Sequence, residues 1–191
     1  MAGRTPRQAV RAFFAPIKTA VGCVSSQPLT LLVEPDFRIG ARIGAMTQNL
    51  DAIPVRGTLG TFWISLAIAG QVVEDDRPDR GPFRVMTTQY SFTLSEDADE
   101  AREMLAYHWT PEAPGDQVRA PHLHVGRTVL NDRYRDDPMC LHRRHIRTDR
   151  VSVEQFALLL IEEFRVTPQN PRWHSVLASS HGTFARYRRP I

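Results

Sequence analysis

The middle of the chain alternates between apolar and polar residues over three stretches, residues 58–73, 84–94 and 103–110. Because successive side chains of a β-strand point to opposite faces of a sheet, this alternation predicts strands. An acidic turn at residues 95–100 separates the second stretch from the third, which predicts an antiparallel hairpin. A short run at residues 121–126 follows a loop containing proline and glycine, and we expect it to lie beside the hairpin as a further strand.

Helices are predicted on both sides of these strands. Residues 6–21 carry apolar side chains at helical spacing, and Gly22 ends the pattern. Ser152 and Gln155 have the spacing of a capping box, and Asn170 followed by Pro171 is typical of the start of a second, shorter helix. The expected fold class is therefore α+β, a mainly antiparallel sheet with an N-terminal helix and two C-terminal helices.

The chain of 191 residues is long enough to bury one substantial core, and we expect a single domain over residues 1–191. Residues 74–82 are rich in charge and proline, so they form either a hairpin tip or a boundary between two lobes. Residues 29–33 predict a short strand, whereas the mixed pattern of residues 37–54 favours no element.

The sequence also bears on where the protein acts. No apolar stretch approaches the roughly 18 residues of a membrane span, so we expect no membrane partner. Its two cysteines, Cys23 and Cys140, are far apart and belong to no CxxC pair, which favours reduced thiols. These features predict a cytoplasmic location.

The candidate site is the segment at residues 121–126, Pro-His-Leu-His-Val-Gly. If the segment is extended, its period of two places His122 and His124 on one face. Such a pair has three explanations: both rings are structural and hydrogen-bonded, they act as general acid and base, or they bind a metal. Gly126 stands where the histidine-triad hydrolase signature has its third histidine.

A metal site would need at least one more ligand. His108 on the preceding predicted strand is the nearest candidate, so the metal set would be His122, His124 and His108, with His142 and His145 behind it. The pattern identifies no cofactor.

Arginines surround the histidine pair, although the whole chain has a net charge of only +3. A local positive field favours an anionic ligand, such as RNA or another phosphate-containing molecule. In that hypothesis His122 and His124 supply base and acid, and Tyr107 joins them as a catalytic residue. Anion binding is assigned to Arg119, Arg127, Arg143 and Arg144.

Residues 90–165 resemble the TumE-like toxin family of bacterial toxin–antitoxin systems. The similar elements are an aromatic strand at residues 90–92, a second one that ends Tyr-His-Trp at 107–109, the Pro-His-x-His segment, and a capped helix that begins near Ser152. The segment is also similar to actinobacterial proteins of no known function. The resemblance implies a small cytoplasmic toxin that acts on RNA and is neutralised by a DNA-binding antitoxin, and it carries over only Pro121, His122 and His124.

Two further hypotheses belong to other classes. The chain could be a non-enzymatic module that binds a protein partner and uses its histidines structurally, or it could be a metal-dependent hydrolase. Metal analysis and detection of a stoichiometric partner distinguish them.

Overall fold

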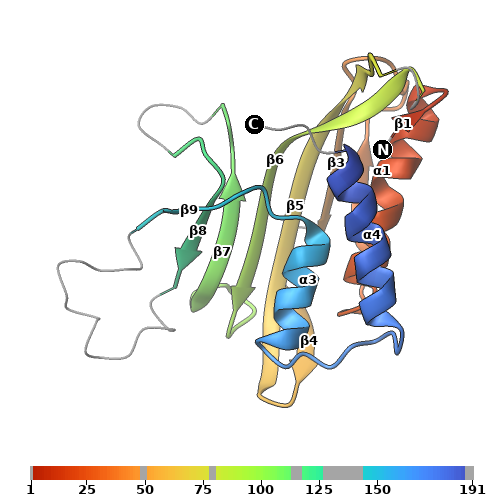
Figure 1. Ribbon diagram of the computed structural model, residues 1–191. Helices are drawn as coiled ribbons and strands as arrows, with labels where there is room; N and C mark the ends of the chain where they lie inside the picture. Colours follow the sequence, from red (N-terminus) through yellow and green to blue (C-terminus); the bar gives the residue numbers. More distant parts are fainter. Residues whose placement is uncertain (1, 48–50, 78–80, 113–117, 127–143, 188–191) are drawn as a thin grey trace.

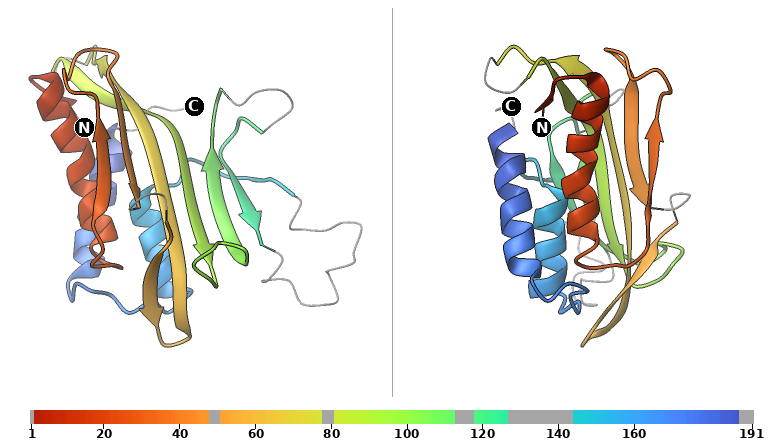
Figure 2. Two further views of the ribbon diagram at one scale, coloured as in Figure 1. Left: turned by 180° about the vertical axis from the view of Figure 1, so that it is seen from behind. Right: turned by 90° about the vertical axis from the view of Figure 1, so that its right-hand side faces the viewer.

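The computed structural model describes residues 2–47, 51–77, 81–112, 118–126 and 144–187. Within these residues the chain forms a nine-stranded antiparallel sheet and three helices (Figure 1). Figure 2 shows the helices together on one side of the sheet, so the opposite face carries no helical layer among the described residues. The predicted fold class is confirmed.

In chain order the elements are β1 (Ala2–Gly3), α1 (Pro6–Val21), β2 (Leu29–Val33), β3 (Arg42–Thr47), β4 (Ile53–Gly57), β5 (Gly60–Glu74), β6 (Phe83–Ser95), β7 (Glu103–Trp109), β8 (His122–Val125), β9 (Ile146–Arg147), α3 (Val153–Glu162) and α4 (Trp173–Tyr187). The strands follow the spatial order β2-β3-β5-β6-β7-β8-β9, with β1 beside β6 and β4 beside β5.

The start of α3 has the predicted capping box. Ser152 accepts a hydrogen bond from the backbone of Gln155, and the Gln155 side chain accepts one from the backbone of Ser152, which completes the capping box of α3. Asn170 accepts a hydrogen bond from the backbone of Arg172 in the turn before α4, which begins at Trp173, two residues after the predicted first position at Pro171. However, α4 has 15 residues and α3 has 10, so the helix expected to be shorter is the longer one.

The unassigned stretch at residues 37–54 contains β3 and the start of β4, both of which pair with β5. β5 is long enough to accommodate both, and its register with β6 shifts between Ala69 and Gly70. Residues 74–82 connect two strands that pair with each other up to Glu74 and Phe83. The sheet therefore continues without a break across this segment.

The core fills the space between the helices and the sheet. Phe156 of α3 is buried, and its ring stacks on Phe92 of β6 at 5.6 Å between centroids. Tyr107 of β7 meets the same ring edge-on at 6.4 Å. The side chains of β6 and β7 that point toward α3 therefore form part of the core. The residues between them in the sequence point to the face without helices. Among the described residues, no helix has the length and apolar character needed to cross a bilayer.

Candidate metal centre

Pairing between β7 and β8 gathers three histidines on the face without helices. His108 pairs directly with His122, and Ala106 pairs with His124. Paired residues of neighbouring strands share a face, as do residues two apart on one strand. The ring centroids of His108 and His124 are 4.9 Å apart, as are those of His122 and His124.

The short strand β9 adds a fourth imidazole. Arg147 pairs with His122 and Ile146 pairs with Leu123, so continuing this register brings His145 opposite His124. Their ring centroids lie 4.5 Å apart, and His145 is 4.8 Å from His122. One ring nitrogen from each of His122, His124 and His145 lies within 4.8 Å of the other two. This arrangement of three imidazoles could hold one metal ion.

Hydrogen bonds to two of the rings help to orient them. His122 is buried, and its Nδ1 lies 2.7 Å from the carbonyl oxygen of Ala120. Because a carbonyl only accepts, Nδ1 carries the proton, and Nε2 keeps its lone pair when the ring is neutral. His108 Nδ1 lies 3.2 Å from the hydroxyl oxygen of Ser91 on β6.

The cluster favours neutral imidazoles. Burial, together with the neighbouring rings of His108, His145 and His122, lowers the pKa of His124 to about 4. Burial also lowers the pKa of His108, with contributions from His122 and His145. At neutral pH both rings are therefore unprotonated, which is the form that binds metals.

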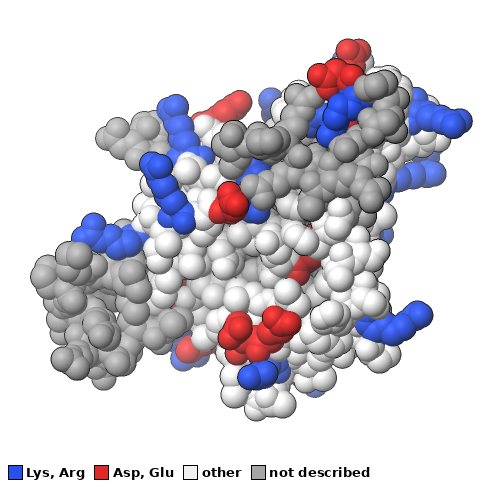
Figure 3. All heavy atoms as spheres, in the orientation of Figure 1, with Lys and Arg blue, Asp and Glu red and all other residues white. Residues whose placement is uncertain are grey.

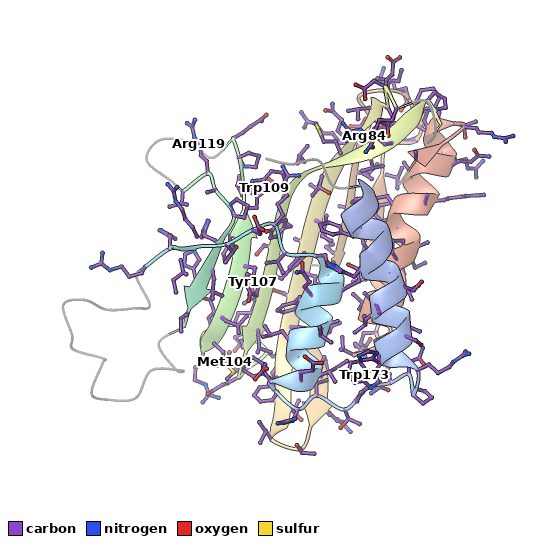
Figure 4. The ribbon with its side chains drawn as sticks, viewed as in Figure 1. Arg84, Met104, Tyr107, Trp109, Arg119 and Trp173 are labelled. Atoms are coloured by element: carbon purple, nitrogen blue, oxygen red, sulfur yellow. The ribbon has the colours of Figure 1, made fainter. Side chains whose placement is uncertain are left out.

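Tyr107 does not join the histidines. It pairs with Leu123, on the face of β7 that packs against α3, and burial raises its pKa. Figure 4 labels Tyr107 on β7 and shows Arg119 in the segment that leads to β8. The structure thus separates Tyr107 from the other predicted catalytic residues, His122 and His124.

Three exposed arginines lie near the cluster in the fold. Arg147 shares the sheet face of His122, Arg144 precedes His145, and Arg119 lies shortly before β8. In the face shown in Figure 3, basic side chains lie mostly around the periphery, including the β7–β9 side. Of the other predicted site residues, Arg127, Arg143 and His142 lie outside the described residues.

Comparison of the chain with protein-family models, with curated proteins and with solved structures gave no match. Proposals about the function therefore depend on the geometry of the histidine cluster and its surroundings.

Proposed function

We propose that the chain is a metal-dependent hydrolase of phosphate esters, in which His122, His124 and His145 hold one divalent transition metal ion. The observation that carries the proposal is the mutual distance of their ring nitrogens, all within 4.8 Å. Three nitrogens bound to a tetrahedral zinc ion at about 2.1 Å are about 3.4 Å apart. Small side-chain rotations close this difference, and the exposed ring of His145 has room to make them.

The ligand types favour a particular class of metal. Neutral imidazole suits zinc, copper, iron and nickel better than calcium or magnesium, which prefer oxygen ligands. The Ala120 carbonyl behind His122 resembles the outer partners that orient metal-binding histidines in general. Three protein ligands leave a fourth position for water, and zinc lowers the pKa of that water to about 7.

The charge around the cluster favours an anionic substrate. Arg147 lies on the same face as His122, and Arg119 and Arg144 are exposed on adjoining segments. Guanidinium groups bind phosphoryl oxygens and stabilise the charge that develops during transfer. A metal ion held by His122, His124 and His145 would supply a hydroxide for attack on phosphorus, and as the new bond to phosphorus forms, the bond to the leaving oxygen would break. The leaving group takes the bonding electron pair, and the proton lost by water passes to solvent.

A metal-free reaction on RNA is supported less well. It would use His122 and His124 as acid and base, and the lowered pKa of His124 restricts that ring to the role of base at neutral pH. It would also use Tyr107, which packs against α3. RNA as a substrate, an antitoxin partner and a cytoplasmic location therefore stay predictions.

The test begins with the full chain after removal of metal by a chelator. Titration with zinc, manganese and iron(II) should give about one equivalent bound for at least one of them. The loaded protein should then release p-nitrophenolate from methyl p-nitrophenyl phosphate, and the chelator should abolish the release. His124→Ala should lose both properties.

His174→Ala is the matched control, because His174 is exposed on α4, away from the cluster. It should bind metal and cleave the ester as the unaltered chain does. The proposal fails if no metal binds at micromolar concentration, or if His124→Ala binds it equally well. RNA cleavage that persists in chelator and requires His122 and His124 would favour the metal-free reaction.

A further inference from the structure

A hollow of about 730 Å³ lies on the face of the sheet without helices, next to the histidine cluster. Strands β2, β3, β5, β6 and β7 all contribute to its lining. Small residues form part of it, because Gly44 of β3 pairs with Ala69 of β5, and Ala67 is two residues away on the same face. Without large side chains at these positions, the sheet surface is left recessed.

His108 belongs to both the hollow and the cluster. It lines the hollow, and its ring centroid is 4.9 Å from that of His124. A single cross-strand row connects the two regions, since Ala67 pairs with Ser91, Ser91 with His108, and His108 with His122. Neighbouring strands are about 4.8 Å apart, so Ala67 lies about 14 Å from His122. A molecule bound over Ala67 can therefore reach the cluster if it is extended.

The lining is aliphatic on the β2–β3 side and more polar toward His108. Leu32 of β2, which pairs with Gly44, and Met46 of β3 supply aliphatic surface, whereas Gln89, Ser91 and Thr110 are polar. The charged residues that reach the hollow, Glu34 and Arg42, lie on the β2–β3 side, across the sheet from His108. A hydrocarbon chain over Leu32, Met46 and Ala67 would bury aliphatic surface, whereas a sugar and base would give up hydrogen bonds to water there.

We infer that the substrate is a phosphodiester with an aliphatic chain, which lies in this hollow while its phosphoryl group meets the histidines and arginines. This inference rests on the proposed hydrolase function and adds the class of substrate. The aliphatic chain would lie on the aliphatic part of the hollow, and the anionic phosphoryl group would lie at the histidine cluster and its arginines.

Three diesters that share a p-nitrophenyl leaving group test the inference. Their second ester group is methyl, octyl or thymidine 5′, and each is used below its micelle-forming concentration. The same bond from phosphorus to p-nitrophenolate breaks in all three. With the zinc-loaded chain, kcat/KM for the octyl ester should exceed that for the methyl ester by at least about 10-fold, because burial of each methylene adds to binding. The thymidine ester should resemble the methyl ester.

Ala67→Phe fills the hollow and should bring the octyl-to-methyl ratio close to one. Ala101→Phe is the matched control, since Ala101 is exposed in the turn before β7, and it should keep the ratio of the unaltered chain. If Ala67→Phe no longer binds zinc, Ala69→Leu provides the same test from the neighbouring position.

Equal rates for the octyl and methyl esters, or a preference for the thymidine ester, would overturn this inference and leave the hydrolase proposal standing. A ratio that survives both Ala67→Phe and Ala69→Leu would also overturn it, because the chain would then bind elsewhere. Absence of zinc binding and of cleavage of every ester would instead contradict the hydrolase proposal itself.

Discussion

The three proposed ligands differ in exposure in a way that suits a metal entering from solvent. His122 is only 6% exposed and is fixed through the Ala120 carbonyl, so it provides a rigid ligand. His124 is half-buried between the other rings, and His145 is exposed directly before the short strand β9. A preformed pair with a third, more accessible ligand allows the ion to exchange its water before the site closes.

His145→Ala should weaken zinc binding more than His108→Ala. Loss of a direct ligand should lower the affinity for zinc by more than the roughly 10–100-fold decrease that follows loss of an outer hydrogen-bond partner. His108 is bonded to Ser91 through Nδ1 and borders the hollow, so we expect its replacement to cost less than about 10-fold. Competition with a chromogenic zinc chelator measures both affinities. A larger loss in His108→Ala would restore His108 as the third ligand.

Some of the histidines in the cluster could be predicted from the sequence, and others could not. The period of two was sufficient to place His122 and His124 on one face. Tyr107 and His108 are consecutive on one strand, so only one of them can share that face, and the strand register selects His108. His145 required the register of β9, which has two residues and follows residues 127–143, so no local alternation identified it.

At the scale of elements, the edge of the sheet is fixed by close backbone approaches. The Gly126 N–H donates to the Met104 carbonyl oxygen at 2.7 Å, directly after β8. A Cβ at this position would overlap the carbonyl group of Glu103 on β7. The third histidine of a histidine-triad signature therefore has no room here, and the third imidazole comes instead from His145, directly before β9.

Gly126→Ala should push the end of β8 away from β7 and disturb His124 two residues earlier. We expect it to lower the free energy of unfolding by about 1–3 kcal/mol, as overpacking usually does, and to weaken zinc binding as well. Gly182→Ala is the control, because a Cβ at Gly182 of α4 meets no atom within 4 Å. Denaturant unfolding with and without zinc measures both effects. Unchanged zinc affinity in Gly126→Ala would show that β8 does not depend on this contact.

The connection between β5 and β6 contains a buried carboxylate. The side chain of Asp75 is fully buried and accepts hydrogen bonds from the Arg77 guanidinium at 2.7 Å, and Arg84 lies 4.0 Å away. Its backbone N–H donates to the Pro82 carbonyl oxygen, which links the two ends of the connection. These arginines, Arg77 foremost, lower the pKa of Asp75 below its ordinary value.

Asp75→Asn should therefore reduce stability in a pH-dependent way. A depressed pKa makes the carboxylate stabilising above its unfolded pKa of about 3.9, and the contribution disappears as the pH falls through the lower folded value. We expect a loss of about 1.5–3 kcal/mol at pH 7, typical of hydrogen bonds to charged groups, and a smaller difference below pH 4. Urea unfolding from pH 7 to pH 3 measures it, with exposed Asp51→Asn as control. A difference that does not shrink in acid would contradict the assignment.

The element pattern was predicted best where alternation or capping was strong. The bounds of α1 and β2 match the predicted ranges, and β6 and β7 form the predicted hairpin. β3 was not predicted, because Gly44 lies inside it and glycine usually marks a turn. In the sheet this glycine packs close to the Ile68 carbonyl oxygen, so its lack of a side chain serves packing, which no local pattern reveals.

Across the molecule as a whole, one face of the sheet serves packing and the other carries the candidate site. Helices cover one face of the sheet (Figure 2) and form the core with it. The other face carries the histidines and the hollow. Pairing of β5 with β6 extends from Trp63 and Ser95 to Glu74 and Phe83, so the two halves of the chain share one continuous sheet. Force and strain applied to one half should then pass to the other through backbone hydrogen bonds.

We therefore expect zinc to stabilise the whole chain as one unit. Zinc at 100 times its dissociation constant should add about 2.7 kcal/mol, which for a chain of this size raises the Tm by about 5–10 °C. Calorimetry should show a single transition that moves as a whole, and His124→Ala should abolish the shift. Two transitions, of which only one responds to zinc, would mean that residues 74–82 separate two lobes after all. Such a result would confine the metal centre to the second lobe, although β5 of the first lobe supplies Ala67 and Ala69 to the hollow beside it.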